Sequence, residues 1–304
     1  MKIAFMGSPK FAAEVLAGIL DQHEIVCVVT QPDAPVGRGH QMQFNPVKQL
    51  AMEHHIPVLQ PKKISLDVQP LIAYCPDIIV TCAFGQILRQ NVLDAAPHGV
   101  INVHGSLLPK YRGAAPIQWA IINGETTTGV TIAQTELGLD CGPIITSLPL
   151  VIDPEDTAGD LFNKMTAVGI RALLTALTQI ENGTATFTPQ DHAAASNAPM
   201  LNKTMAKIDW QQDAVTIANL IRGLNPWPVA YFDLSGTPIK VYRATVLSGS
   251  ATPGMVVQAN ARDGLIIGCG NNLLKIELLQ VPGKKMITGN DFCNGRNLTA
   301  MKLD

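Results

Sequence analysis

The sequence predicts an α/β protein, in which a Rossmann-like, mostly parallel sheet domain is followed by a small OB-like β-barrel domain. In the first two-thirds of the chain, continuous runs rich in Val and Ile alternate with helical segments. This alternation is typical of a parallel sheet covered on both faces. In the last third, short strand-like segments follow one another between glycines and prolines, which is typical of a small barrel.

The first domain can be traced element by element. Strands are expected at 2–6, 24–30, 77–82 and 99–104, helices at 10–20, 45–54, 114–123 and 157–181, and a further strand pair at 127–135 and 143–151. The first strand-to-helix turn, Gly7-Ser8-Pro9-Lys10-Phe11, has a single glycine. A dinucleotide site needs the further glycines of G-x-G-x-x-G so that the backbone can approach a pyrophosphate. The sequence therefore gives no reason to expect NAD.

The second domain follows a loop-like stretch around residues 182–206. A helix is expected at about 212–222, and strands at 229–234, 239–247, 254–259, 264–269 and 273–280. We therefore expect a catalytic domain over residues 1–189, a linker over 190–207 and the barrel over 208–304.

Composition limits the class of protein. Of 304 residues, 47% are apolar and 15% are charged, which is enough to fill the cores of two domains. The sequence has no apolar run of transmembrane length, and its N-terminus begins a strand without a leader-like segment, so a cytoplasmic protein is expected. Six cysteines are scattered singly, which predicts reduced thiols, with Cys27 and Cys82 buried in strands, and no metal site.

The formal net charge of −2 is unevenly distributed. Residues 1–202 carry 11 Lys and Arg against 17 Asp and Glu, or −6, and the remainder carries 11 against 7, or +4. A basic C-terminal third is a modest indication of a polyanionic partner.

Two polar side chains stand at the end of the apolar run 100–104. Asn102 and His104 are two residues apart, so on a strand they point to the same face, while Ile101 and Val103 point into the packing. In open parallel sheets ligands bind beyond the carboxyl ends of the strands. Asp140 lies in a turn-prone segment between two later strands. An amide, an imidazole and a carboxylate suit acyl transfer, as oxyanion donor, proton carrier and orienting charge, although a single buried Asn or His is more often structural.

The segment 102–116, Asn-Val-His-Gly-Ser-Leu-Leu-Pro-Lys-Tyr-Arg-Gly-Ala-Ala-Pro, resembles the signature of the folate-dependent formyltransferases. Segments 6–12, 31–39 and 221–228 extend the resemblance over nearly the whole chain, and they favour the branch that formylates methionyl-tRNA. The resemblance implies transfer of a formyl group from 10-formyltetrahydrofolate to the α-amino group of initiator methionyl-tRNA. Asn102 and His104 would stabilise the oxyanion and Asp140 would support His104. The resemblance implies no metal, and we expect a monomer.

The same resemblance suggests binding residues. The folate would lie against three short segments, represented by Phe84, Gly85, Ile87 and Leu88, by Ser106, Leu107, Leu108 and Pro109, and by Leu137, Gly138 and Leu139. Arg89 stands where the family usually has proline. Arg38, Lys203 and Lys207 are the expected tRNA contacts, although the usual lysines after Gly-Arg-Gly are replaced here by His40-Gln41-Met42.

Two alternatives stay open from the sequence alone. A sugar-nucleotide formyltransferase shares the Asn, His and Asp arrangement, but the segments 31–39, 114–118 and 221–228 favour the tRNA enzyme. A catalytically silent RNA-binding protein could keep the fold, but it would have no need of all three of Asn102, His104 and Asp140.

Overall fold

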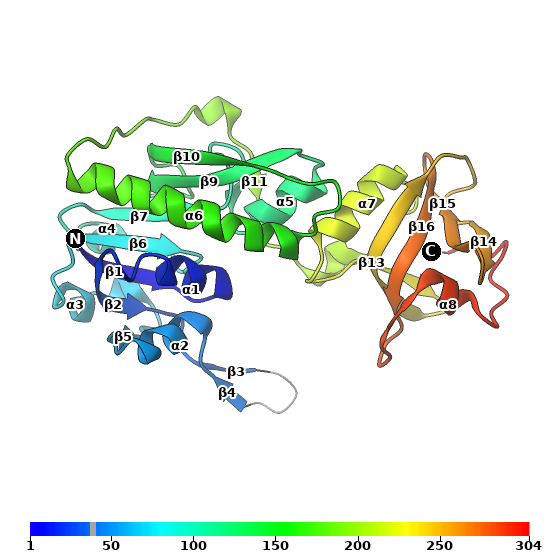
Figure 1. The fold of residues 1–304 in the computed structure, drawn as a ribbon, viewed down its shortest axis with the longest axis horizontal. Coiled ribbons are helices and arrows are strands. Elements are labelled where there is room, and N and C mark those ends of the chain that lie inside the picture. The colour runs from blue at the N-terminus through cyan, green and yellow to red at the C-terminus, as the bar shows by residue number, and fades with distance from the viewer. Residues whose placement is uncertain (37–40, 304) are drawn as a thin grey trace. The chain divides into compact units, whose positions relative to one another are not determined.

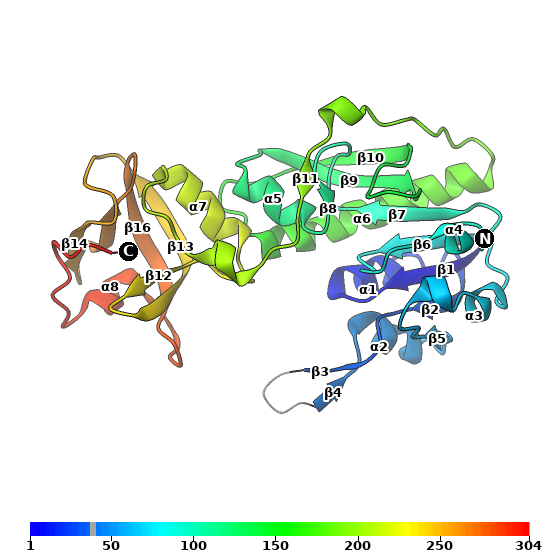
Figure 2. The same cartoon turned by 180° about the vertical axis from the view of Figure 1, so that it is seen from behind.

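The computed structural model describes residues 1–36 and 41–303. The chain forms two compact units, one made of residues 1–116, 127–151 and 162–199 and the other of residues 117–126, 152–161 and 200–304. Figures 1 and 2 show a mostly parallel sheet with helices in the first unit and a curled antiparallel sheet in the second. The predicted fold class is confirmed.

The first unit is built on a seven-stranded sheet with the order β10-β9-β7-β6-β1-β2-β5. Its strands are β1 (Lys2–Gly7), β2 (Glu24–Val29), β5 (Val58–Leu59), β6 (Ile78–Cys82), β7 (Val100–His104), β9 (Thr127–Gln134) and β10 (Ile144–Val151). The five strands from β5 to β7 run parallel, whereas β9 pairs antiparallel with both β7 and β10. All five residues of β6 are buried, as expected for a strand covered on both faces.

Helices α1 (Lys10–Ala17) and α6 (Ala158–Glu181) cover one face of this sheet (Figure 1). Phe11 and Phe162 meet edge to face, with ring centroids 6.1 Å apart. The other face is covered by the short helices η1 (Ile64–Leu66), α3 (Gln69–Ile72) and α4 (Gln90–Leu93), over a buried cluster that includes Met6, Ile79 and Val100. Val100 shares its strand face with Asn102 and His104, so the expected catalytic residues lie at the carboxyl end of this second face.

Helices α2 (Pro46–Glu53) and α5 (Pro116–Ile122) complete the predicted helices of the N-terminal part. Helix α1 ends at Ala17 rather than residue 20, and Gly18 follows at its C-cap position. A hairpin of β3 (Ala34–Val36) and β4 (Gln41–Gln43), which the sequence did not suggest, precedes α2.

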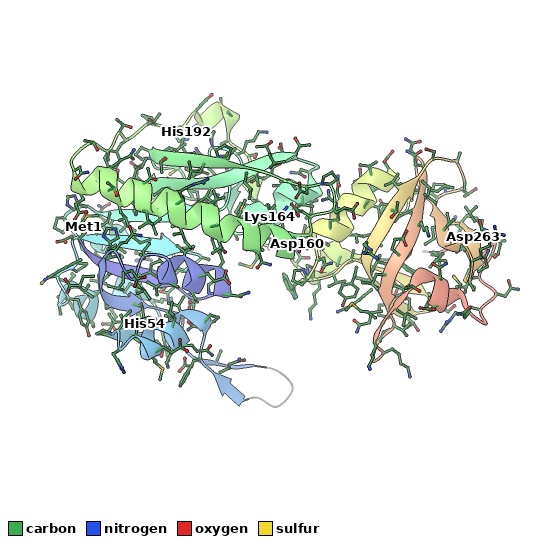
Figure 3. The ribbon with its side chains drawn as sticks, in the orientation of Figure 1. Met1, His54, Asp160, Lys164, His192 and Asp263 are labelled. Carbon is green, nitrogen blue, oxygen red and sulfur yellow. The ribbon has the colours of Figure 1, made fainter. Side chains whose placement is uncertain are left out.

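The stretch expected to be a linker contains local structure. It includes the turns η2 (His192–Ala194) and η3 (Lys203–Ala206) and the strand β11 (Asn197–Ala198), which pairs in parallel with β8 (Arg112–Gly113). Before it, Thr188 pairs with Ile144 of β10. Figure 3 marks His192 on this segment. Residues 188–198 are therefore fastened to the first unit.

The second unit contains helix α7 (Ala214–Gly223), whose first turn is capped by the Asp213 carboxylate. Its antiparallel sheet has the order β12-β13-β16-β15-β14, with β17 paired to β16. The bounds are β12 (Tyr231–Leu234), β13 (Thr237–Leu247), β14 (Val256–Asn260), β15 (Gly264–Gly268), β16 (Leu273–Gln280) and β17 (Met286–Thr288), followed by α8 (Gly289–Cys293). The five predicted strands are present, while β17 and α8 were not predicted.

All six cysteines are free thiols, and Cys27 and Cys82 are fully buried, as the sequence predicted. Of the helices within residues 1–36 and 41–303, none has the length and hydropathy needed to cross a membrane.

Candidate active site

Asn102 is held in place from both ends of its side-chain amide. It pairs with Thr81 across the parallel strands β6 and β7, and the Thr81 hydroxyl donates to Asn102 Oδ1 over 2.9 Å. Asn102 Nδ2 donates to Asp140 Oδ1 over 3.2 Å. One amide hydrogen of Asn102 is thus directed at Asp140, and the orientation of the amide is fixed by Thr81.

His104 is buried, and its side chain is 5% exposed. Its Nε2 lies 2.8 Å from the carbonyl oxygen of Tyr111. Because a carbonyl can only accept, Nε2 carries the hydrogen of the neutral ring. Nδ1 is then the basic nitrogen, and it faces Asp140 Oδ2 at 3.6 Å. A proton taken up at Nδ1 would therefore sit beside a carboxylate.

Asp140 lies in the loop between β9 and β10 with φ of +49°, a left-handed backbone conformation that is uncommon for residues other than glycine. Its Oδ2 accepts the backbone N–H of Gly113 over 2.8 Å, and its side chain is 15% exposed. The structure thus brings Asn102, His104 and Asp140 together, although 36 residues separate Asp140 from His104 in the sequence.

The loop 111–113 supports this cluster from its other side, and the sequence reasoning missed it. Tyr111 accepts from His104 through its carbonyl group, and Gly113 donates to Asp140 through its N–H. Gly113 has φ of +122°, and a Cβ there would lie 2.7 Å from the carbonyl oxygen of Ala198 in β11. Only glycine fits at this position without strain. Close packing against a distant strand leaves no signal in the local sequence.

The sequence reasoning also missed Gln190, which is 6% exposed and hydrogen-bonded to the backbone of Asp140. It lies in an irregular stretch with neither helical nor strand periodicity, so only its tertiary contacts reveal it.

Comparison with known proteins places the chain in a family. Residues 1–177 match the formyl transferase family model, and residues 200–297 match that of the formyl transferase C-terminal domain. The chain belongs to the formyl transferase family. The methionyl-tRNA formyltransferase of Geobacter metallireducens is 44% identical over 98% of this chain and 96% of its own length. That of Desulfotalea psychrophila is 45% identical over 99% and 94%.

Solved structures share the formyl transferase fold. An N-formyltransferase from Helicobacter canadensis, in complex with folinic acid and dTDP-3-aminofucose, superposes with a TM-score of 0.69. It is 21% identical, and the match covers 91% of this chain and 99% of that chain. At this identity the similarity concerns the fold.

In this formyl transferase, the expected folate residues differ in exposure. Ile87, Leu137 and Leu139 are 87%, 63% and 66% exposed, unusual values for large apolar side chains. Phe84 and Leu108 are buried, Gly85 and Gly138 have positive φ, and Leu88, Leu107 and Pro109 are half-buried. Ser106 is fully buried, and its hydroxyl donates to the carbonyl oxygen of Lys110 over 2.6 Å.

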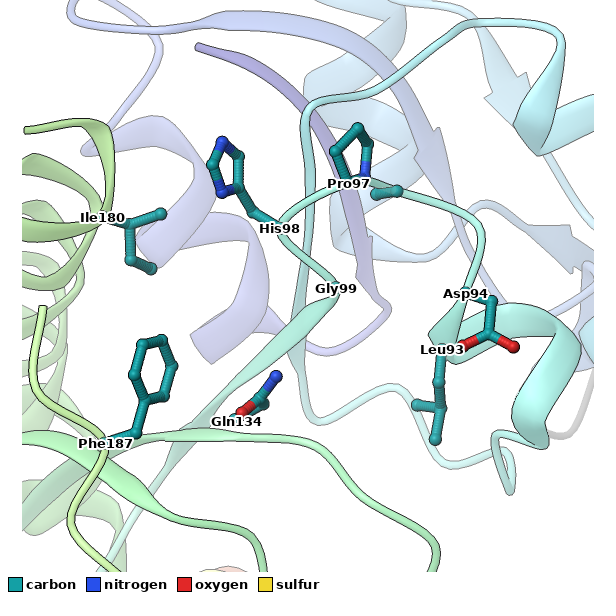
Figure 4. Close-up of a pocket in the computed structure, with 9 residues that line it drawn as sticks. Leu93, Asp94, Pro97, His98, Gly99, Gln134, Ile180 and Phe187 are labelled. Carbon is teal, nitrogen blue, oxygen red and sulfur yellow. The ribbon is translucent and has the colours of Figure 1, made fainter. Parts of the chain in front are cut away.

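Two adjoining pockets lie near the start of β7, and Asn102, His104 and Asp140 line neither of them. One, of about 370 Å³, is lined by Val100 and Thr135 among others and extends to Leu137 of the expected folate loop. The second, of about 530 Å³, shares Leu93, Asp94, Gly99 and Gln134 with the first and extends to Ile180 and Phe187 (Figure 4). Leu137 is the expected folate residue that lines the first pocket.

The expected tRNA-binding residues come from other parts of the chain. Arg38 is outside the described residues. Immediately before β3, the carboxylate of Asp33 accepts from Lys48 Nζ at 2.5 Å and from Gln60 Nε2 at 2.9 Å. Hydrogen bonds from Lys48 and Gln60 lower the pKa of Asp33. Lys203 and Lys207 belong to the second unit and are exposed, and Lys207 Nζ is 3.4 Å from Asp233.

Proposed function

We propose that this chain transfers the formyl group of 10-formyltetrahydrofolate to the α-amino group of initiator methionyl-tRNA. The observation that carries the proposal is the Asp140 carboxylate, held between the Asn102 amide and the His104 imidazole at the carboxyl end of a parallel sheet. Relatives that match over nearly their full length are methionyl-tRNA formyltransferases, which supports this substrate pair. We place the reaction in the cytoplasm and assign it to a monomer.

The proposed reaction is a direct attack. The methionyl amine adds to the formyl carbon, so that the C=O oxygen becomes an oxyanion, and the folate nitrogen leaves with a proton while the amine loses one. Asn102 Nδ2 and protonated His104 are assigned to the oxyanion, because donors aimed at developing charge lower the barrier most effectively. Asp140 stabilises the imidazolium. No Ser or Cys nucleophile is required, and the Ser106 hydroxyl is already bonded to Lys110.

The described residues fit a folate beside this cluster. A pterin is flat and carries donors and acceptors, so it needs apolar walls and polar groups that are free to pair. The exposed side chains of Ile87, Leu137 and Leu139 provide apolar surface. Thr135 lines the 370 Å³ pocket, and its hydroxyl oxygen is buried without a hydrogen-bond partner among the described residues.

The tRNA is assigned to two regions. Arg38, which follows β3 in the sequence, would contact the acceptor end, and the basic residues beyond 202, including Lys203 and Lys207, would contact phosphates. We accordingly assign catalysis to residues 1–189 together with the segment up to residue 198 that packs on the first unit, and RNA contact to Arg38 and to the basic residues from Lys203 onward. Each phosphate contact contributes affinity that weakens with salt, because binding releases counterions.

The decisive experiment measures formyl transfer by the purified chain to charged initiator methionyl-tRNA, with a dTDP-amino sugar as the competing acceptor. We expect product on the tRNA alone, and its loss in the matched variant His104→Ala. Transfer to the sugar, or to neither acceptor, would contradict the proposal.

A second measurement tests the RNA contact. Arg38→Ala should lower the catalytic efficiency on methionyl-tRNA and make its salt dependence shallower, while the binding of a folate analogue is unchanged. An unchanged efficiency at every salt concentration would remove Arg38 from the interface.

A further inference from the structure

We propose that Gln190 is a positioning residue of this active site, which fixes the loop of Asp140 to the loop that supports His104. The inference rests on the proposed function, because it concerns the same reaction. Gln190 lies 50 residues from Asp140 and 78 from Arg112, and it contacts both. The residue is buried, with 6% of its surface exposed.

One end of the amide holds the Asp140 turn. Nε2 donates to the carbonyl oxygen of Asp140 over 2.9 Å and to that of Gly142 over 2.7 Å. Both amide hydrogens are therefore committed to two carbonyl groups of one turn. Asp140 occupies the left-handed region, which its Cβ disfavours, so its backbone would tend to relax if these bonds were removed.

The other end of the amide holds the loop 111–113. Gln190 Oε1 accepts from Arg112 Nε over 3.1 Å and from Arg112 Nη2 over 2.7 Å. Arg112 lies between Tyr111, which accepts from His104, and Gly113, which donates to Asp140. A bond from a guanidinium polarises the amide and strengthens its Nε2 donors. One side chain thus ties together the backbone groups that orient the imidazole and the carboxylate.

The consequence for chemistry is geometric. The separation of His104 Nδ1 and Asp140 Oδ2, now 3.6 Å, depends on the placement of these two loops. Misplacement of a catalytic group by about 1 Å can cost about 10²-fold in rate. Gln190 touches neither reacting group, so its effect must pass through Asp140 and His104.

The test uses two variants and a control. Gln190→Met removes both sets of bonds at similar volume, while Gln190→Glu keeps an acceptor for Arg112 and loses the donors. Gln179→Met, on α6 of the same unit, is the control for loss of a glutamine. We expect kcat on methionyl-tRNA to fall about 10–100-fold in Gln190→Met, with the control unchanged. For Gln190→Glu, the ratio of its kcat to the wild-type kcat should rise as the pH is lowered. A protonated carboxyl can again donate a hydrogen bond to one of the two carbonyl groups.

A double-mutant cycle separates positioning from general stability. In an Asp140→Asn background, Gln190→Met should lower kcat by a clearly smaller factor than in the wild-type background, because one of the two groups through which it acts is already altered. An equal loss in both backgrounds, or a pH-independent deficit in Gln190→Glu, would overturn the inference. If Gln190→Met does not fold, the pH behaviour of Gln190→Glu decides. A wild-type protein that does not formylate methionyl-tRNA would refute the proposed function, whereas additive losses in an active enzyme would refute the role of Gln190.

Discussion

Replacing Asp140 with asparagine tests the electrostatic part of the site. The change keeps the shape of the side chain but removes its charge. At the observed 3.6 Å, and at an effective dielectric constant of about 20, an imidazolium and a carboxylate attract each other by about 4–5 kcal/mol. That value is an upper limit on the loss from the charge pair alone. The new NH₂ group must also face the N–H of either Asn102 or Gly113, which leaves two donors opposed.

We therefore expect kcat of Asp140→Asn to fall by roughly 10²–10³-fold, since about 1.4 kcal/mol corresponds to a factor of ten. The assay is single-turnover formylation at saturating tRNA, across a range of pH, so that product release does not mask the chemical step. Asp140→Glu serves as the companion variant, because it keeps the charge and shifts its position. If Asp140→Asn keeps the wild-type rate and pH profile, Asp140 is only a turn residue and the electrostatic argument fails.

Four further predictions follow from other features. His104→Ala should lower the single-turnover rate by about 10²–10⁴-fold while a folate analogue still binds; a near wild-type rate would exclude His104 as the proton carrier. Gly113→Ala should destabilise the protein by about 1–3 kcal/mol in chemical denaturation, through strain at positive φ, and unchanged stability would contradict the crowding seen there. At pH 8 a thiol reagent should modify exposed Cys75 rapidly but Cys27 only after unfolding, because burial raises the pKa of the Cys27 thiol to about 12; a Cys75→Ser variant should have one fewer fast-reacting thiol. Burial lowers the pKa of His23 below its ordinary value of 6.5, with a smaller contribution from the N-terminal ammonium. The unfolded state therefore binds more protons, and the free energy of unfolding should decline as the pH falls through 6.5. The variant His23→Leu should have a smaller pH dependence of stability in this range, and an identical pH dependence would contradict the assignment.

The sequence predicted those helices and strands in which packing requires apolar residues to repeat at regular spacing. The strands β1, β6 and β7 are short apolar runs with buried faces on both sides, and α6 repeats its apolar residues at helical spacing. Elements without such a period were missed. The two-residue strands β8 and β11 exist because they pair with each other, 85 residues apart, and neither has a propensity that would predict it alone.

The residues of the site also fall into those that local sequence geometry predicts and those that only tertiary contacts bring in. Asn102 and His104 could be placed together because strand geometry puts residues two apart on one face, and the observed contacts of both with Asp140 confirm that the three residues meet. No spacing rule brings a loop residue to a strand, so Asp140 was grouped with them by the chemistry of the three side chains and by the family resemblance. The supporting contacts of Tyr111 and Gly113 are made by the backbone, and a backbone hydrogen bond has no side-chain signature in a sequence.

The cluster also shows why its supports must come from far along the chain. A carboxylate between an amide and an imidazole is useful only if its loop keeps its conformation. At φ of +49° the backbone of Asp140 is strained, so contacts from other residues must stabilise it. Local hydrogen bonds are insufficient, because the loop of Asp140 must keep its register with a different loop, the one that carries Gly113. A buried side chain with donors at one end and an acceptor at the other can satisfy both loops at once, and Gln190 has that chemistry and makes those contacts. The segment that carries Gln190 therefore positions the Asp140 loop against the loop that supports His104, although it lies 50 residues from Asp140 in the sequence.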